Sequence, residues 1–186
     1  AYFAVMTYDA VCVPLLADFL PQNVADLTRL SDSRLLLVDD SIFAGLEREK
    51  VLPQFESFTD FCGLVNVAGL GILISCNSTL DGVEEKVEAA FAKRFPNGVA
   101  PEHINYKKTD LEPISVISYT SGTSSSPKGV MLSARSISSN LQFALDHIPA
   151  DENDKILSIL PLAHIFGQIF DFVYPFASGC HINIFT

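Results

Sequence analysis

A polar segment enclosed by two apolar runs constrains this chain most. Residues 119–130 read Tyr-Thr-Ser-Gly-Thr-Ser-Ser-Ser-Pro-Lys-Gly-Val. The segment begins at the last residue of a hydrophobic run, Ile114–Tyr119. Small hydroxyl residues and glycine let several backbone N–H groups point into one concavity, and with a nearby cation such a concavity can hold a polyphosphate. We therefore predict a strand over 114–119, a phosphate-binding loop, and the return arm of a hairpin over 129–132.

The order of residues in this segment excludes the common nucleotide P-loop. That motif needs Gly-Lys-Ser/Thr, whereas here Pro127 precedes Lys128 and Gly129 follows it. The segment instead resembles the phosphate-binding loop of the adenylate-forming ligases, which include acyl-CoA synthetases, peptide-synthetase adenylation domains and luciferases. Ser125 stands where these ligases usually have glycine. The alternative is a flexible Ser/Thr-rich linker, which the flanking apolar strands disfavour.

Two further segments stand in the order found in that family. Residues 160–167, Leu-Pro-Leu-Ala-His-Ile-Phe-Gly, resemble its Pro-Leu-x-His segment, which lines the acyl pocket beside the adenylate. Residues 8–15, Tyr-Asp-Ala-Val-Cys-Val-Pro-Leu, resemble its Gly-Ala-x-x-Val-Pro-Leu strand, with Asp9 at the position of the glycine. The resemblance therefore covers nearly the whole chain and points to a long-chain fatty acid–CoA ligase type of enzyme.

The resemblance implies roles for individual residues. Those that would hold the leaving phosphates of ATP are Thr120, Ser121, Gly122, Thr123 and Ser124. Lys128 would add a cation that neutralises the charge of the leaving phosphates; alternatively, it is a solvated lysine of the loop. His164 would act in the acyl part of the site; alternatively, it is a histidine of the core. Gly167 would lie beside the substrate; alternatively, it permits two helices to cross. No residue is assigned to a metal.

The reaction implied by the resemblance uses ATP, Mg²⁺ and CoA. A fatty acid attacks the α-phosphate, pyrophosphate leaves, and CoA then takes the acyl group, so the protein must align the acid and neutralise the leaving charge. A fatty acyl-AMP ligase or acyl-carrier-protein synthetase is the first alternative, and a non-catalytic nucleotide-binding or scaffold module is the second. The Tyr-Gly-x-Thr-Glu segment and the C-terminal catalytic lysine of the family do not occur here, so we expect the 186-residue chain to be inactive by itself.

Composition limits the partners. The net charge is −10, from 22 acidic and 12 basic side chains, which disfavours nucleic acid because phosphate backbones need clustered Lys and Arg. Hydrophobic residues make up 48% and charged residues 18%, so we expect an uncovered apolar surface and self-association. Peripheral membrane contact of the full-length enzyme is also allowed. Four cysteines without CxxC spacing indicate free thiols in a reducing compartment, the cytoplasm.

Apolar runs alternate with amphipathic segments along the chain, which predicts an α/β fold with a mostly parallel sheet flanked by helices. The uncharged run Phe61–Leu80 is interpreted as a buried strand pair and not as a membrane span. We expect one fragment of a larger domain, with a first α/β portion over 1–110 and a phosphate-loop and acyl-pocket portion over 111–186. Expected strands are 11–15, 34–38, 70–76, 114–119, 155–160 and a last strand after Gly179; expected helices are 21–30, 42–52, 81–95, 133–148 and 164–177.

Overall fold

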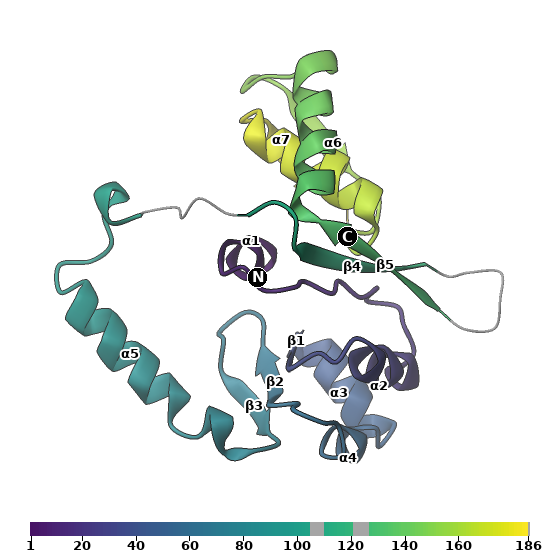
Figure 1. The fold of residues 1–186 in the computed structure, drawn as a ribbon, viewed down its shortest axis with the longest axis vertical. Helices are drawn as coiled ribbons and strands as arrows, with labels where there is room; N and C mark the ends of the chain where they lie inside the picture. Colours follow the sequence, from purple (N-terminus) through teal and green to yellow (C-terminus); the bar gives the residue numbers. More distant parts are fainter. Residues whose placement is uncertain (105–109, 121–126, 186) are drawn as a thin grey trace. The chain divides into compact units, whose positions relative to one another are not determined.

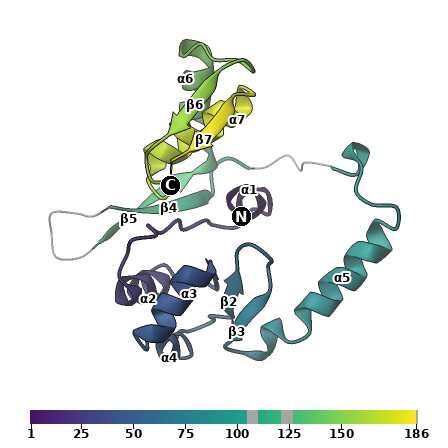
Figure 2. The same cartoon turned by 180° about the vertical axis from the view of Figure 1, so that it is seen from behind.

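The computed structural model describes residues 1–104, 110–120 and 127–185, and its elements follow the predicted mixture of helices and strands (Figures 1 and 2). The chain divides into two compact units. Unit 1 comprises Ala1 and Phe19–Lys108, and unit 2 comprises Tyr2–Asp18 and Thr109–Thr186. The expected α/β class is confirmed. That the chain is one piece of a larger domain, with portions meeting near residue 110, stays a prediction.

Unit 1 is built on a three-stranded sheet with the order β1-β2-β3. Strand β1 (Leu35–Val38) runs parallel to β2 (Gly63–Asn66), which pairs antiparallel with β3 (Ile72–Ser75). The helices of this unit are α2 (Pro21–Leu30), α3 (Asp40–Arg48), α4 (Leu52–Phe55) and α5 (Val83–Arg94), with 3-10 turns at Ser78–Leu80 and Pro101–His103. The predicted strand pair within Phe61–Leu80 is confirmed, and within the described ranges no helix is long and apolar enough to cross a membrane.

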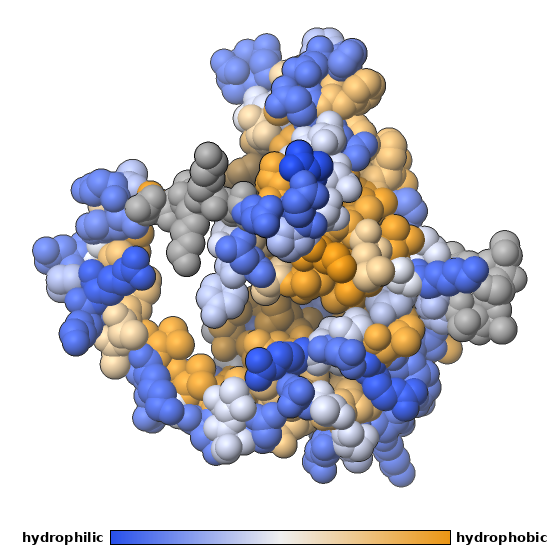
Figure 3. All heavy atoms as spheres, in the orientation of Figure 1, coloured by the Kyte–Doolittle hydropathy of each residue, from blue (hydrophilic) through white to orange (hydrophobic). Residues whose placement is uncertain are grey.

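Aromatic and aliphatic side chains fill the core of unit 1. Phe55 and Phe61 are fully buried, and their ring centroids lie 5.3 Å apart. The apolar sides of α2 and α3 contribute Leu27 and Leu46 to the buried set. Because Pro21 stands in the first turn of α2, where the missing N–H costs nothing, the sequence fixes where this helix begins. Helix α5 buries none of its residues, and in Figure 3 its hydrophobic spheres gather along one side.

Helix α3 begins at a side-chain cap that shifts its predicted start. The carboxylate of Asp39 accepts hydrogen bonds from the Ile42 N–H at 2.8 Å and from the Ser41 hydroxyl at 2.7 Å. These bonds stabilise the charged form and lower the pKa of Asp39. The helix therefore starts two residues before the predicted Ile42 and ends at Arg48.

Unit 2 contains two separate strand pairs and the helices packed on them. The hairpin strands β4 (Ile114–Thr120) and β5 (Lys128–Ser133) are antiparallel, whereas β6 (Lys155–Ser158) and β7 (His181–Ile184) are parallel. The helices of this unit are α1 (Tyr2–Thr7), α6 (Ala134–His147), the π-helix η3 (Gly167–Val173) and α7 (Tyr174–Ala177). The described strands therefore form small sheets of mixed direction, where the sequence predicted a mostly parallel sheet.

The predicted strand over Val11–Leu15 is wrong. Residues 10–16 contain no strand and form only an isolated parallel bridge between Cys12 and Val116. Cys12 N–H donates to the Ser115 carbonyl at 2.8 Å, and its carbonyl accepts from Ile117 N–H at 2.9 Å. The segment ending in Pro14 thus supplies too few backbone groups to continue the ladder, because proline has no N–H to donate.

One hydrophobic cluster holds the elements of unit 2 together. Val116 of β4, Ile137 of α6 and Ile169 of η3 are buried against one another. Leu132 of β5 and Ile165, which precedes η3, pack against this cluster from its edges. The hairpin and the segment that follows β6 are therefore mounted on the same core.

Candidate functional site

The predicted phosphate loop is the tip of the β4–β5 hairpin. Thr120 is the last residue of β4 and Lys128 the first residue of β5, and the two are direct partners in the register. The Thr120 hydroxyl donates to the Lys128 carbonyl at 3.5 Å, and both side chains are exposed. The predicted return arm is confirmed, and the hairpin brings the first and last of the expected phosphate contacts together. The other predicted contacts, Ser121, Gly122, Thr123 and Ser124, lie outside the described residues, as does Ser125.

Gly129 has a packing reason to be glycine. It is the register partner of Tyr119, and a Cβ atom built on it would lie 3.2 Å from Cε1 of the Tyr119 ring. The same atom would lie 3.0 Å from Cγ2 of Ile117. The absence of a side chain therefore gives the tyrosine ring room across the hairpin, next to Lys128, as aromatic residues opposite glycine often do.

His164 lies in a tight turn between β6 and η3. Its N–H donates to the Pro161 carbonyl at 2.8 Å, and its own carbonyl accepts from the Gln168 N–H at 3.0 Å. The ring atom Nδ1 accepts a long hydrogen bond from the Phe166 N–H at 3.4 Å. The side chain is exposed, so the alternative of a core histidine does not hold. The role predicted for His164 in the acyl part of the site stays a prediction.

Gly167 closes the same turn from its other end. It is buried, and a Cβ atom there would lie 2.9 Å from the Pro161 carbonyl oxygen and 3.1 Å from Cβ of Leu160. The chain itself occupies the space that a side chain would need. Its predicted place beside the substrate stays a prediction.

The helix expected over 164–177 changes register in its middle. Residues 167–173 form a π-helix and 174–177 an α-helix, and the chain stays helical through Pro175. Pro175 stands in the first turn of α7, the part of a helix in which proline is tolerated. The π segment before it is a feature that is frequent at functional sites.

Two polar side chains of η3, Asp171 and Gln168, stand out in the structure, and the sequence interpretation singled out neither of them. Oδ2 of Asp171 accepts from the N–H groups of Ile159 and Leu160 at 3.3 and 3.2 Å. The side-chain amide of Gln168 is buried, and no described protein atom hydrogen-bonds to it, which is uncommon for a buried amide. The available signal was the presence of an acidic and an amide side chain in an otherwise apolar helix.

A half-buried thiol next to the hairpin, that of Cys12, is not a candidate nucleophile. Partial burial raises the pKa of this thiol, which disfavours the nucleophilic thiolate. Burial also raises the pKa of Tyr2 to about 12, with a smaller contribution from Cys12. All four cysteines, including Cys62, Cys76 and Cys180, are free.

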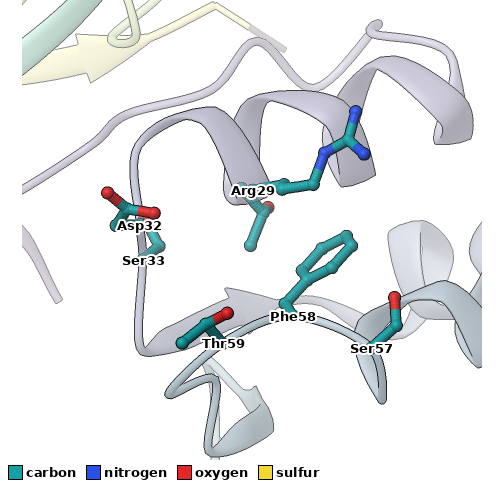
Figure 4. A pocket seen from close by; sticks show the side chains of 7 residues that line it. Arg29, Asp32, Ser33, Ser57, Phe58 and Thr59 are labelled. Carbon is teal, nitrogen blue, oxygen red and sulfur yellow. The ribbon is translucent and has the colours of Figure 1, made fainter.

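Other groupings in the described residues offer little chemistry. No group of three or more His, Cys, Asp or Glu side chains that could hold a metal occurs among them. A pocket of about 110 Å³ in unit 1 lies between the end of α2 and the loop after α4 (Figure 4). Its lining residues are Thr28, Arg29, Asp32, Ser33, Ser57, Phe58 and Thr59. It includes none of the predicted site residues, and its only basic side chain, Arg29, pairs with Asp26 at 3.6 Å.

The fold and the hairpin define an α/β protein that presents a Ser/Thr/Gly–Lys segment between two paired strands. The sequence model of the family described as "AMP-binding enzyme" matches residues 1–186, so the chain belongs to this family of adenylate-forming ligases. Membership confirms the resemblance found in the sequence.

Individual relatives cover parts of the chain. It is 43% identical over 70 residues to a long-chain-fatty-acid–CoA ligase of Rattus norvegicus, covering 35% of this chain and 10% of that protein. It is 39% identical over 59 residues to a chloroplastic long-chain-fatty-acid–[acyl-carrier-protein] ligase of Arabidopsis thaliana, covering 32% of this chain and 8% of that one. The chain thus spans about a tenth of the length of these two relatives.

A solved structure matches the fold over the whole chain. The crystal structure of ATP-bound MatB from Rhodopseudomonas palustris superposes with a TM-score of 0.68 at 19% identity, covering 100% of this chain and 32% of that one. At this identity the likeness concerns the fold alone. The small sheets and helices described above therefore recur in the fold of that protein.

Proposed function

We propose that the complete protein activates a fatty acid with ATP and transfers the acyl group to CoA. The observation that carries the proposal is the β4–β5 hairpin, which joins Thr120 and Lys128 at the base of a segment that resembles the family's phosphate loop. A lysine at this position supplies a cation to the departing pyrophosphate, and stabilising developing charge is usually the largest part of catalysis. The match to a long-chain-fatty-acid–CoA ligase supports the class of acid.

The reaction divides between two parts of unit 2. The hairpin tip would hold the β- and γ-phosphates through backbone N–H groups, hydroxyl groups and Lys128. The His164 turn would meet the acid. Mg²⁺ would be bound mainly through the ATP phosphates, since the described residues supply no ligand cluster of their own and Mg²⁺ usually keeps several waters. The proposal also places the protein in the cytoplasm, which fractionation of cells would test.

An acyl-carrier-protein ligase is the second candidate, because a relative of that name matches the chain at 39% identity over 59 residues. Both classes of ligase form the acyl adenylate first, so the acceptor of the acyl group distinguishes them. A screen for pyrophosphate release over carboxylic acids of increasing chain length, with the complete gene product, tests adenylate formation. Adding CoA or acyl-carrier protein and detecting the product then identifies the acceptor. A protein that binds ATP without releasing pyrophosphate would instead be a nucleotide-binding module.

Substitution of Lys128 tests the assigned role directly. Lys128→Ala should lower kcat/KM for ATP by about 10- to 1000-fold, the range expected for losing one charge-stabilising contact, with little change in KM for the acid. His164→Ala should instead lower kcat/KM for the acid, with little change in KM for ATP. Steady-state kinetics with each substrate varied separate the two effects. Lys93→Ala, which removes an exposed lysine from the last turn of α5, is the matched control.

If both variants shift the same parameter equally, the division of roles between the hairpin and the His164 turn is wrong. If Lys128→Ala behaves like Lys93→Ala, the loop assignment itself is wrong.

A further inference from the structure

Asp171 reaches back along the chain to hold the end of a strand. It lies in η3, and its Oδ2 accepts from two consecutive backbone N–H groups, those of Ile159 and Leu160, at 3.3 and 3.2 Å. These two residues directly follow β6, whose last residue is Ser158. Backbone groups beyond the end of a strand lose their ladder partners. The carboxylate supplies an acceptor at this point.

The segment held in this way is the turn that carries His164. Asp171 fixes it where β6 ends, at Ile159 and Leu160. At the helix end, the Gly167 backbone lies so close to the Pro161 carbonyl that an added Cβ atom would come within 2.9 Å of its oxygen. Between them, His164 N–H donates to the same Pro161 carbonyl at 2.8 Å. The turn is therefore tied to η3 at two places: the Gln168 N–H donates to the His164 carbonyl at 3.0 Å, and Asp171 holds the strand-side end at Ile159 and Leu160.

The turn itself is not buried. Ile159 and Leu160 are 66% and 39% exposed, and His164 is exposed as well. Water can therefore replace the carboxylate as acceptor for the two N–H groups, so the loss of Asp171 should cost little global stability. Water does not tie the turn to η3. What is lost is the tie between η3 and the strand-side end of the turn, so the Pro161 carbonyl that accepts from the His164 N–H is no longer held from that side against the core that η3 shares with β4.

We propose that Asp171 is a positioning residue, which sets the placement of His164 for the acid-dependent part of the reaction by holding the Ile159–Leu160 backbone. The inference rests on the proposed function. Its physical basis is that a displacement of about 1 Å in a reacting or binding group can cost about 100-fold in rate. Asp171 acts through the turn and is not itself assigned a contact with substrate.

The kinetic test uses the complete gene product and five variants, one of them the double variant of His164 and Asp171. Asp171→Ala should lower kcat/KM for the acid by about 10- to 100-fold and change KM for ATP by less than about twofold. Asp171→Asn keeps one acceptor oxygen and should retain most of the activity. In the His164→Ala background, Asp171→Ala should add little, because the two act through the same group. Asp146→Ala, which removes an exposed carboxylate of α6, should have no effect.

A second measurement does not depend on substrate. Hydrogen exchange followed by mass spectrometry should show faster exchange in residues 159–164 of Asp171→Ala than in wild type or Asp146→Ala, while the thermal midpoint changes by only a few degrees. The positioning role would be overturned if Asp171→Ala lowered kcat/KM for the acid equally in the wild-type and His164→Ala backgrounds. Unchanged hydrogen exchange in residues 159–164 would overturn it as well. If wild type releases pyrophosphate and His164→Ala is impaired while Asp171→Ala is not, this inference alone fails. If wild type releases no pyrophosphate with any acid, the proposed function fails, and the role assigned to Asp171 fails with it.

Discussion

Four of the described helices are followed by a residue whose backbone has the left-handed conformation. After α1, α2, α3 and α7, the residue two positions past the helix has a positive φ: Asp9, Asp32, Lys50 and Gly179. In each case its N–H, and that of the following residue, donate back to carbonyls of the last helical turn, as Asp9 does to Met6 and Ala10 to Val5. This is the Schellman arrangement, which usually has glycine at that position. The departure of Asp9 from the family's glycine therefore has a local explanation, since Asp tolerates this conformation better than most residues.

The least suitable of these residues gives a prediction. Lys50 has φ +57°, and its N–H donates to the Glu47 carbonyl at 3.0 Å. Lys50→Gly should raise the free energy of unfolding by about 0.5–1 kcal/mol, because relief of the left-handed strain exceeds the added freedom of the unfolded chain. Denaturant unfolding measures the change. Lys86→Gly inside α5 is the control and should be destabilising by about 1 kcal/mol; a loss of stability in Lys50→Gly would show that the strain is negligible.

At the scale of elements, the sequence predicted local structure better than pairing. The helices predicted over 21–30 and 133–148 begin within one residue of α2 and α6, because the start signals, Pro21 and Ser133, lie within one turn of each helix. The hairpin was predicted because its two strands are neighbours in the chain. Strand direction in the sheets and the single bridge at Cys12 were not predicted. The partner of a strand can lie far away in the sequence, and hydrophobic periodicity does not identify it.

The candidate site shows the same limit. The sequence indicated Lys128 and His164 through their motifs, but it did not indicate that Asp171 holds the turn of His164. That contact spans 11 and 12 residues and joins η3 to the end of β6, a proximity that no local pattern specified. The opposition of Gly129 and Tyr119 likewise became visible only in the strand register.

The pairing of β2 with β3 depends on one glycine. A Cβ atom built on Gly63 would overlap the Ile74 carbonyl of β3 and lie 2.8 Å from Cδ1 of Leu80. Gly63→Ala should therefore lower the free energy of unfolding by about 1–3 kcal/mol, the usual cost of overpacking. Gly69→Ala is the matched control, since no atom lies within 4 Å of its Cβ position. Equal unfolding midpoints for the two variants would show that β3 shifts without cost.

For the molecule as a whole, the β6–β7 pair presents an apolar surface that unit 2 leaves uncovered. Parallel strands are normally covered on both faces. Here Ser158 lies buried on one face, while Leu157, which points to the other, is 58% exposed, and Ile159 just beyond the strand is 66% exposed. Elsewhere in unit 2, hydrophobic side chains also reach the surface (Figure 3). Such surfaces mark places where another protein surface packs.

The exposed strand pair predicts that the 186-residue chain associates with itself. The opposing factor is the net charge of −10, which repels like chains. Raising the ionic strength from about 0.01 M to about 0.15 M shortens the Debye length from about 30 to about 8 Å, so association should increase with salt.

Leu157→Lys should reduce association, because it removes apolar surface and places a charge at the contact. Gln142→Lys, which adds the same charge on the exposed side of α6, should change it little. Light scattering over a range of protein concentrations measures the association. A monomer at high concentration and moderate salt would show that the β6–β7 surface does not drive contact, and equal behaviour of the two variants would place the contact elsewhere.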